Sequence, residues 1–334
     1  MKNKIQHGQF YTQGNCFNHA TFVEWYNQIP NNQDLKIIEP FAGANNIIRL
    51  IDEVGLSIPH SQWASYDIEP EAVAENTVPD VKLQKRDTLK DYPSGFDICI
   101  TNPPYLAKNS AKRKGMNIDF GMHADLFEIS LEVMLANSKY VAAIIPESFI
   151  SRGIFTERLH AVISLNYEMF DDTDFPVCLA LFNAEPSEDY DIYIGDSLVG
   201  KAKEIESKAK KLLAISEKNN IKIKFNDPQG QLGLRAVDGT KKANISFVQG
   251  NTIDSSSIKI SSRAITRISF EKKYSDAELN LIIEKSNKIL AKYRELTKDV
   301  FMTSFKGLRE DSYYRRRLDF KTAADIIRKA ISEI

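Results

Sequence analysis

The sequence is poor in cysteine, with three in 334 residues (Cys16, Cys99 and Cys178) and no closely spaced pair. Such a scattered, odd set provides neither a disulfide framework nor a zinc site, and it favours a reducing compartment. The five histidines also lack metal-ligand spacing. No apolar run approaches the length of a membrane span, and the first residues are polar. We therefore expect a cytoplasmic protein with no metal and no membrane contact.

Charge is unevenly distributed, although the net charge is only −1. Residues 1–184 contain 15 Lys and Arg against 23 Asp and Glu, a net charge of −8. Residues 185–334 contain 29 against 22, a net charge of +7. This asymmetry suggests that the second half faces a polyanion. Two ordinary surfaces with a chance imbalance are the alternative.

The first half of the sequence alternates short apolar runs with helical patterns, and no repeat or low-complexity segment interrupts it. This alternation predicts βαβ units and a parallel sheet that is covered on both faces. The expected strands are 35–38, 63–68, 81–84, 96–101, 140–145 and 177–182, and the expected helices are 47–54, 69–76 and 125–136.

The second half has a different pattern. A polar helix is expected at 197–219, and alternating residues, as in 221–225 and 258–260, predict short strands. Ser275 and Glu278 form a capping box that should open a long amphipathic helix. We therefore expect a small α+β domain after the α/β domain.

Residues 102–105 read Asn-Pro-Pro-Tyr, directly after an expected buried strand. The Asn102 carboxamide can accept a hydrogen bond, and Pro103 has no N–H, so it contributes only its carbonyl. Two acceptors beside the flat ring of Tyr105 suit a planar amino group that loses a proton while it is alkylated. A bare pair such as Pro103-Pro104 is more often a strand terminator, but the four residues together are more specific.

A small-residue loop follows the first expected strand, and its candidate ligand-binding residues are Glu39, Pro40, Ala42 and Gly43. In a parallel sheet, ligands bind beyond the carboxyl ends of the strands. Small side chains let a ligand approach the backbone, and an acidic residue can hold an ammonium group. An ordinary turn containing glycine is the alternative.

Acidic residues also follow the second and third expected strands. Asp67 could accept hydrogen bonds from both hydroxyls of a ribose, and the neighbouring Ile68 could pack on an adenine ring. Asp87, followed by Thr88, could accept from an amino group of the same ligand. Alone, each Asp is as well explained by a helix cap or a solvated turn. Their register after successive strands favours a shared site.

In order and spacing, these motifs resemble the gamma class of N6-adenine DNA methyltransferases of restriction–modification systems. The resemblance covers residues 7–182 and implies an α/β fold. It implies a Rossmann-like catalytic domain at 1–184, with a mostly parallel seven-stranded sheet that binds S-adenosylmethionine. Residues 185–334 would then form a smaller α+β target-recognition domain. Double-stranded DNA and a cognate restriction endonuclease are the implied partners. The same chemistry on RNA adenine or protein glutamine, and a non-catalytic DNA-binding subunit, remain alternatives.

The resemblance also implies a role for each motif. The methionine part of the cofactor would contact Phe10, Tyr11 and Thr12 together with Glu39, Pro40, Ala42 and Gly43. Its ribose and adenine would contact Asp67, Ile68, Asp87 and Thr88. The target base would be bound by Asn102, Pro103, Pro104 and Tyr105 and stacked by Tyr105 and Phe175, although Phe175 could equally be a core residue. One departure is Asn45, where the class commonly has a second glycine.

Two basic clusters are candidate DNA contacts, and the alternative for each is a solvated surface. They comprise Lys108, Lys112, Arg113 and Lys114 after the catalytic motif, and Arg315, Arg316 and Arg317 near the end of the sequence. Cys99 and Cys178 lie inside apolar runs and should be inert thiols. This favours direct attack by an amine over covalent catalysis.

Overall fold

The computed structural model describes residues 14–73, 75–167, 169, 175–216 and 221–334. The chain forms two compact units. The first unit extends to Leu198, except for Ile150–Arg152, and the second comprises those three residues and Val199–Ile334. Among the described residues, no helix has the length and apolar character needed to cross a bilayer.

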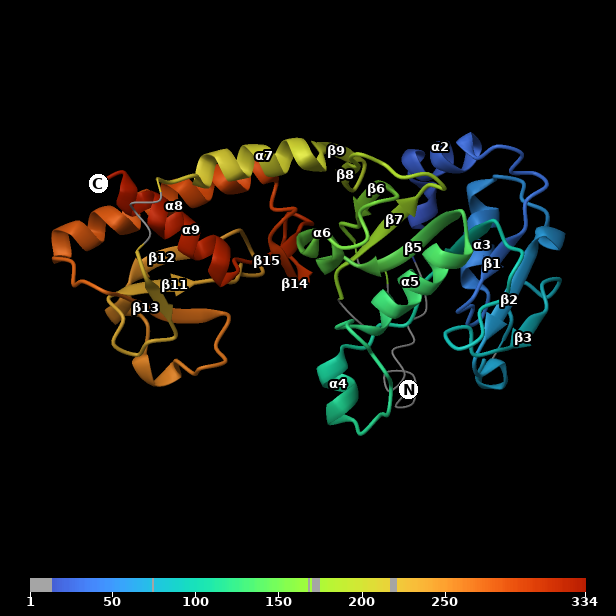
Figure 1. The fold of residues 1–334 in the computed structure, drawn as a ribbon, viewed down its shortest axis with the longest axis horizontal. Helices are drawn as coiled ribbons and strands as arrows, with labels where there is room; N and C mark the ends of the chain where they lie inside the picture. Colours follow the sequence, from blue (N-terminus) through green and yellow to red (C-terminus); the bar gives the residue numbers. More distant parts are fainter. Residues whose placement is uncertain (1–13, 74, 168, 170–174, 217–220) are drawn as a thin grey trace. The chain divides into compact units, whose positions relative to one another are not determined.

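The first unit is built on a mixed sheet in the order β3-β2-β1-β4-β5-β7-β6-β8-β9 (Figure 1). The strands are β1 (Ile37–Glu39), β2 (Trp63–Asp67), β3 (Leu83–Lys85), β4 (Ile98–Thr101), β5 (Tyr140–Pro146), β6 (Leu159–Ser164), β7 (Val177–Phe182), β8 (Asp191–Ile194) and β9 (Ser197–Lys201). Strands β1 to β5 pair in parallel, whereas β7 runs antiparallel to both β5 and β6. The result is a mixed α/β fold with a large, mostly parallel sheet.

The sheet has nine strands, and the expected count of seven is wrong. The two additional strands are β8 and β9, which continue the sheet beside β6. Ile192 and Ile194 of β8 are buried, so this strand contributes to the core although its polar neighbours conceal it in the sequence. The sheet therefore extends past residue 184.

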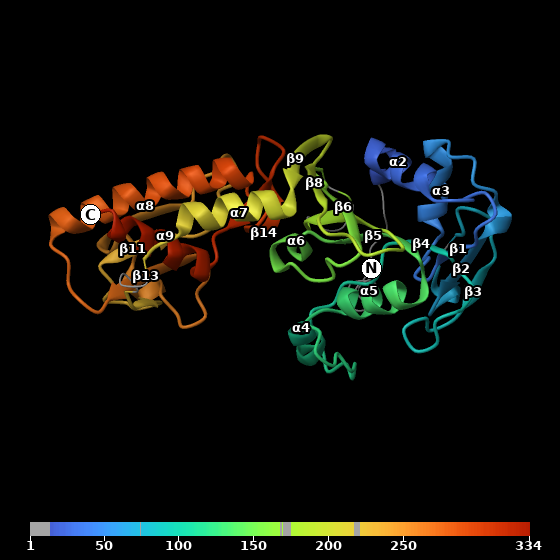
Figure 2. The same ribbon diagram turned by 45° about the horizontal axis from the view of Figure 1, so that its top comes forward.

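Helices cover both faces of this sheet, which explains why β4 and β7 are buried along their whole length. Figure 2 shows α2 and α3 on one side and α5 on the other. The helices are α2 (Ala20–Gln28), α3 (Asn46–Val54), α4 (Lys108–Arg113), α5 (Leu126–Asn137) and α6 (Ser148–Arg152), with short 3₁₀ turns η1 (Cys16–Asn18), η2 (His60–Gln62) and η3 (Pro70–Ala72). The helix expected at 69–76 is reduced to η3, because the Asn76 side chain bonds the backbone of Val78 and Val81 instead.

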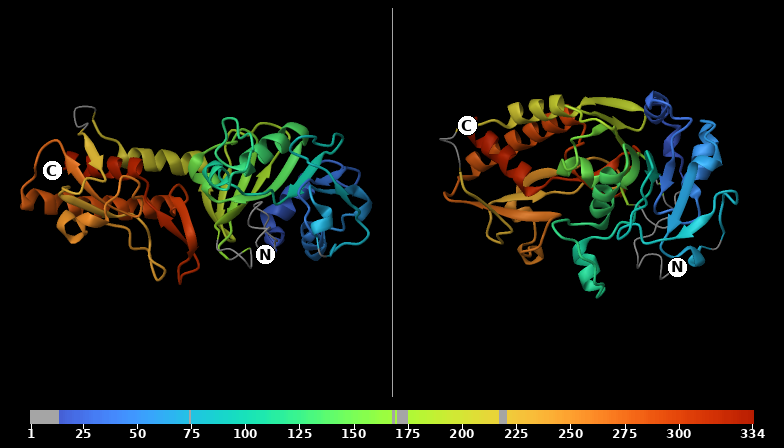
Figure 3. Two further views of the ribbon diagram at one scale, coloured as in Figure 1. Left: turned by 90° about the horizontal axis from the view of Figure 1, so that it is seen from below. Right: turned by 45° about the vertical axis from the view of Figure 1, so that its right-hand side comes forward.

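The second unit has an antiparallel sheet in the order β10-β13-β11-β12 and a separate β14–β15 pair. Its helices α7, α8 and α9 lie side by side (Figure 3). The elements are α7 (Ala202–Leu213), β10 (Ile223–Phe225), β11 (Leu232–Arg235), β12 (Ser246–Gln249), η5 (Gly250–Thr252), η6 (Ser255–Ser257), β13 (Ile265–Phe270), α8 (Asp276–Thr297), β14 (Thr303–Leu308), β15 (Tyr314–Arg317) and α9 (Phe320–Ser332).

The capping box is confirmed, because Ser275 and Glu278 bond each other's backbone N–H groups at the start of α8. Residues 258–260 form a turn instead of the expected strand, and residues 197–201 form β9 ahead of the shorter helix α7. On α8, the Asn287 carboxamide accepts from the Phe247 N–H of β12 and donates to the Phe247 carbonyl, both at 2.9 Å. This side chain therefore bonds the backbone of an edge strand of the sheet.

Candidate active site

The strand order reverses direction at β1, which pairs with β2 on one side and β4 on the other. Such a switch point opens a crevice beyond the carboxyl ends of the strands, where α/β proteins bind their ligands. Glu39 ends β1, Asp67 ends β2, and Asn102 directly follows β4. The structure therefore brings three of the sequence-predicted residues to one edge of the sheet.

The loop after β1 is held by the loops of its neighbours. The Ala42 N–H donates to the Tyr66 carbonyl at 2.9 Å, and the Gly43 N–H donates to Asp67 Oδ2 at 3.0 Å. The Thr88 hydroxyl, after β3, donates to the Pro40 carbonyl at 2.8 Å. Gly43 has φ +51°, a conformation that glycine adopts without steric cost. These bonds fix a loop of small residues at the switch point.

Asn45 explains how this loop accommodates a residue where a second glycine is common. Its φ of +60° is left-handed, a conformation that asparagine tolerates better than most residues. Its fully buried amide donates to Asn76 Oδ1 at 2.8 Å and accepts from the Ser65 hydroxyl. Asn45 therefore connects the start of α3 to two other segments, a function that glycine could not supply.

Glu39 is a buried acidic residue at this edge of the sheet. It is 1% exposed, and its Oε2 atom is buried with no hydrogen-bond partner in the part of the chain that the structure describes. Burial, and secondarily the charge of Asp67, raises the pKa of Glu39 well above its usual range. A buried carboxylate without a partner is costly, and a cationic ligand group would remove that cost. The site therefore fits an ammonium group.

Thr101, the last residue of β4, was missed by the sequence analysis. Its buried Oγ1 atom likewise has no hydrogen-bond partner among the described residues. β4 is the parallel neighbour of β1, so Thr101 ends the strand beside the one that ends in Glu39. A signal for it was available, because Thr101 is the polar end of the apolar run that precedes the Asn-Pro-Pro-Tyr motif.

The remaining candidate cofactor residues differ in exposure. Asp67 is buried and accepts from the Glu69 N–H at 2.8 Å as well as from Gly43. Ile68, beside it, is about half exposed, which leaves an apolar surface open next to the loop. Asp87 forms an exposed ion pair with Lys90 at 2.9 Å. Phe10, Tyr11 and Thr12 lie outside the described residues.

The Asn-Pro-Pro-Tyr motif places a hydroxyl group close to two oxygens. The Tyr105 hydroxyl lies 2.5 Å from Asn102 Oδ1 and 2.6 Å from the Ile144 carbonyl of β5. A tyrosine has one hydroxyl hydrogen, so it can donate to only one of these oxygens at a time. The Tyr105 hydroxyl therefore lies within bonding distance of two acceptors, Asn102 Oδ1 and the Ile144 carbonyl.

Phe175 packs against Tyr105, with ring centroids 6.2 Å apart and an angle of 28° between the planes. The topology explains this contact between residues that are distant in sequence. β7 runs antiparallel to β5, so its start lies at the carboxyl end of β5, where Pro146 pairs with Val177. The structure thus brings together the two aromatic residues that were expected to stack on a base.

The cysteines lack the character of nucleophiles. Burial raises the pKa of Cys99 to about 12 and that of Cys178 well above its usual range. A thiol must ionise to attack, so these side chains are inert. The described residues also contain no group of three or more His, Cys, Asp or Glu side chains that could hold a metal ion.

The two basic clusters have different structures. In the first, Lys108, Lys112 and Arg113 lie on the short helix α4 instead of a loop. In the second, Arg315 to Arg317 belong to strand β15. The Arg315 guanidinium lies 5.0 Å from the Phe305 ring centroid, and Arg316 is only 2% exposed. Arg316 therefore belongs to the interior of the second unit, and an exposed basic surface on β15 can include only its neighbours.

Arg316 is part of a charged core around Asp238 that sequence patterns did not indicate. The Asp238 carboxylate accepts hydrogen bonds from both terminal nitrogens of Arg294, at 2.9 and 2.8 Å, and from Arg309 Nη1 at 3.1 Å. It also accepts from the Arg316 backbone N–H at 3.2 Å. Burial alone would raise the pKa of Asp238, but its bonds to Arg294 and the surrounding positive charge lower it.

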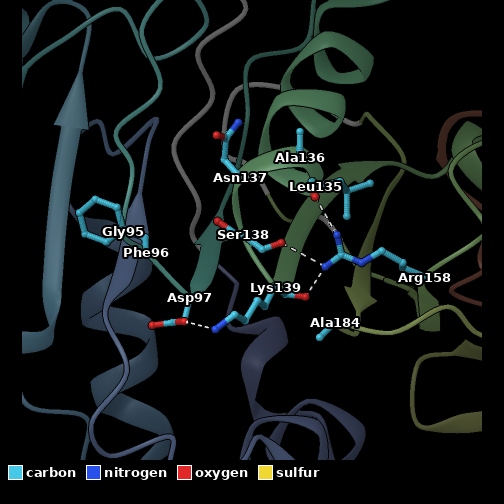
Figure 4. A pocket seen from close by; sticks show the side chains of 10 residues that line it. All are labelled: Gly95, Phe96, Asp97, Leu135, Ala136, Asn137, Ser138, Lys139, Arg158 and Ala184. Carbon is cyan, nitrogen blue, oxygen red and sulfur yellow. Dashed lines mark hydrogen bonds and ion pairs between the residues drawn. The ribbon is translucent and has the colours of Figure 1, made fainter.

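A cavity of about 470 Å³ lies at the opposite edge of the sheet of the first unit (Figure 4). Its wall includes Asp97 and Lys139, which precede the parallel strands β4 and β5, so it lies at their amino ends. Arg158 in this wall donates to the carbonyls of Leu135 and Ser138, and Lys139 pairs with Asp97. These cations already have partners, and the cavity is separate from the candidate active site.

No protein-family model and no curated protein matches this chain. Solved structures give distant matches. A type I restriction–modification methyltransferase subunit from Streptococcus thermophilus is 16% identical over 57% of this chain and 48% of that chain, with a TM-score of 0.41. A modification subunit of a type I restriction enzyme from Vibrio vulnificus is 13% identical over 56% and 47%, with a TM-score of 0.40. A class I S-adenosylmethionine-dependent methyltransferase from Listeria monocytogenes is 16% identical over 55% and 68%, with a TM-score of 0.38.

The chain therefore spans about half the length of the first two of these structures. At such identities and TM-scores the likeness carries no assignment of function.

Proposed function

We propose that this protein is an S-adenosylmethionine-dependent DNA methyltransferase. In this proposal it methylates N6 of an adenine that is flipped out of a short recognition sequence, as the modification enzyme of a restriction–modification system. The observation that carries the proposal is the cluster of Asn102, Tyr105 and Phe175 at the switch-point edge. It offers a hydrogen-bond acceptor and stacked aromatic rings at the same edge of the sheet as Glu39, whose buried Oε2 has no hydrogen-bond partner among the described residues.

The residues of this edge fit the proposed cofactor. Glu39 would hold the ammonium group, beside the backbone of Pro40, Ala42 and Gly43. A carboxylate has about four lone-pair sites, so Asp67 retains capacity for ribose hydroxyls after accepting two N–H groups. Ile68 would offer its exposed surface to the adenine ring, and Asp87 and Thr88 follow β3, the strand that pairs with β2. Phe10, Tyr11 and Thr12 are proposed for the methionine end.

Bound S-adenosylmethionine would supply an electrophilic methyl group for an amino nitrogen. Asn102 Oδ1 and the Pro103 carbonyl would accept the two amino hydrogens of adenine, which raises electron density on the nitrogen. The Tyr105 hydroxyl would then donate to Ile144, so that it does not compete for Asn102. Pro104 separates these acceptors from Tyr105 in the sequence. Catalysis would come from orientation and placed acceptors.

The target base must leave the helix to reach these groups, since an amino nitrogen paired within the stack is inaccessible. Tyr105 and Phe175 would stack on the extruded adenine. Lys108, Lys112, Arg113 and Lys114 would contact phosphates, as would Arg315 and Arg317. We assign catalysis to residues 1–184 and target recognition to residues 185–334, with double-stranded DNA and a cognate restriction endonuclease as partners.

Sequencing the genome of a host that expresses the protein, with detection of modified bases, tests this proposal. We expect N6-methyladenine at one short sequence motif, and none in a host that expresses Asn102→Ala. Purified protein should transfer tritiated methyl groups to unmodified duplex DNA. Transfer to RNA or to protein glutamine in place of DNA, or no transfer at all, would contradict the proposal.

A further inference from the structure

Residues 107–125, here called the basic finger, project from the layers of the first unit directly after the catalytic motif. Figures 1 and 2 show its helix α4 lying away from the sheet. The finger is closed at its base by an antiparallel bridge between Ala107 and Asp125. The Lys108 N–H donates to the Ala124 carbonyl at 2.9 Å, and the Leu126 N–H donates to the Leu106 carbonyl at 3.1 Å. The first and last residues of the finger therefore leave the body of the unit side by side.

The basic finger shares a small apolar core with the residues at its base. Ala111 and Phe120 are buried in one cluster with Leu106 and Leu126, and further apolar side chains pack against this cluster. Asp125 adds a bond at the base, because its Oδ1 accepts from the Leu106 N–H at 3.0 Å. A core and a closed base make the finger a built element instead of a loose loop.

A tight turn at residues 120–123 lies near the closed base of the finger, since the bridged Asp125 follows two residues later. The His123 N–H donates to the Phe120 carbonyl at 2.8 Å, and Gly121 between them has φ +49°. Lys108 Nζ donates to the Gly121 carbonyl at 3.1 Å, which ties the turn to the start of α4. With Phe120 buried, the same turn leaves Met122 92% exposed. The turn therefore presents one flexible apolar side chain to solvent.

The basic finger as a whole carries an excess of positive charge, although its turn at Met122 is anchored to α5 through His123, which lies 3.0 Å from a Glu132 oxygen and 3.6 Å from a Glu128 oxygen. The finger has four cationic side chains against two carboxylates, Asp119 and Asp125, and the latter is used at the base. Lys112 and Arg113 are exposed along α4. A lone exposed apolar residue needs no explanation by itself. Here it lies on a cationic element that starts two residues after Tyr105.

We propose that the basic finger enters the duplex beside the target adenine and that Met122 fills the space that the flipped base leaves. This inference rests on the proposed function. Methionine is among the apolar side chains that proteins insert between base steps. Phosphate contacts by the finger cations would position it, and Met122 would replace the stacking contacts of the extruded base. Tyr105 would stack on the flipped adenine, and the basic finger follows Tyr105 directly in the sequence. The finger would therefore reach the same DNA strand, at the space that the adenine leaves.

The test measures single-turnover methyl transfer from tritiated S-adenosylmethionine by the full-length protein. The substrates are two duplexes that carry the site identified by mapping modified bases. One has thymine opposite the target adenine, and the other has an abasic site there, which lowers the cost of extrusion. We expect Met122→Ala to be slower on the matched duplex by about tenfold or more, since opening a base pair costs a few kcal/mol. On the abasic duplex it should approach the wild-type rate.

Two variants serve as controls. Met122→Leu keeps an apolar side chain of similar size and should restore the rate on the matched duplex. Leu198→Ala removes another exposed apolar side chain of the first unit, 57% exposed on β9, and should leave both rates unchanged. If the wild type is active and Met122→Ala is unimpaired, the proposed role of Met122 is wrong. The same holds if Met122→Ala is equally slow on both duplexes. Neither result contradicts the proposed function. A wild type that methylates neither duplex would overturn the proposed function as well.

Discussion

Each unit of this protein buries one carboxylate at 1% exposure, and the two are held in opposite ways. Glu39 of the first unit has an oxygen with no partner among the described residues, and its pKa is raised by burial and by Asp67. Asp238 of the second unit is bonded by Arg294, Arg309 and backbone N–H groups, and its pKa is lowered.

The difference distinguishes a ligand site from a structural centre. A buried charge with all its partners in the protein holds segments together, whereas one that lacks a partner favours binding of an oppositely charged group. The comparison assigns ligand binding to the edge at Glu39 and stability to the core at Asp238. The sequence pattern indicated Glu39 as a candidate for an ammonium group, but it gave no signal for the structural role of Asp238, whose arginine partners are distant in sequence.

Replacing Asp238 with Ala should have the largest effect, because it removes the buried carboxylate that bonds both Arg294 and Arg309 and leaves these guanidinium groups with Asp299 and Asp311. We expect a loss of about 3–5 kcal/mol in the free energy of unfolding of the second unit. Urea titration followed by circular dichroism measures this loss. Fluorescence of Trp25 and Trp63, the two tryptophans of the chain, reports on the first unit separately.

The control for this variant is Asp311→Ala. Asp311 also pairs with Arg309, at 2.9 Å, but its side chain is 51% exposed. Loss of such an exposed pair should cost less than about 1 kcal/mol. If the two variants were equally stable, Asp238 would not be the centre of this core.

Replacing Asn102 with Ala tests the reaction without disturbing either carboxylate. Loss of one placed acceptor should reduce methyl transfer by about 10²–10³-fold. Cofactor affinity should change little, since Glu39, Asp67 and the loop after β1 remain. Single-turnover rates and calorimetric titration with S-adenosylmethionine measure the two quantities. Near-normal turnover would refute the acceptor role of Asn102.

The two carboxylates should respond to pH in opposite directions. The folded-state pKa of Glu39 is raised, so its contribution to stability is present below the ordinary carboxyl pKa and is lost as pH rises through the folded value. The pKa of Asp238 is lowered, so its contribution is present above the ordinary value and is lost as pH falls through the folded value.

Urea titrations of Glu39→Gln across this pH range isolate the first response. Relative to wild type, the variant should gain stability as pH rises above the ordinary carboxyl pKa, by at most about 1.4 kcal/mol per pH unit. An ammonium ligand would favour the ionised form of Glu39, so binding should release a proton from the wild type but not from the variant. Parallel stability curves for the two proteins would contradict this assignment.

The smallest effect is expected at Arg315 and Arg317, the partly buried neighbours of Arg316 on β15. Arg315→Ala and Arg317→Ala should each weaken DNA binding equally on cognate and scrambled duplexes, and each should reduce the slope of binding against salt by about one. A loss restricted to the cognate duplex would instead indicate a base contact worth about 1–3 kcal/mol. Unchanged binding by both variants would place the DNA-binding surface elsewhere.

Much of the first unit could be predicted from the sequence, because buried parallel strands are continuous apolar runs. β1, β2, β4, β5 and β7 all lie within a few residues of their expected positions. The Asn-Pro-Pro-Tyr motif follows β4 as expected. In the second unit, the capping box located the start of α8, because its signal lies within four adjacent residues.

The errors have physical causes that single-sequence patterns do not contain. β9 is mostly exposed, so it has no apolar alternation to reveal it. Arg316 resembled a surface residue because its interior position depends on Asp238, which is distant in sequence. The expected helix at 69–76 is prevented by side-chain bonds of Asn76. Met122 had no signal in the sequence, since only the folded turn exposes it.

The contact between Asn287 and Phe247 has a consequence for self-association. β12 is an outer strand of its sheet, and outer strands offer unpaired backbone groups to which a strand of another molecule can add. The Asn287 carboxamide occupies both the N–H and the carbonyl of Phe247, as a neighbouring strand would. Helix α8 thereby blocks the addition of an intermolecular strand at this position, and it protects the second unit against edge-to-edge aggregation.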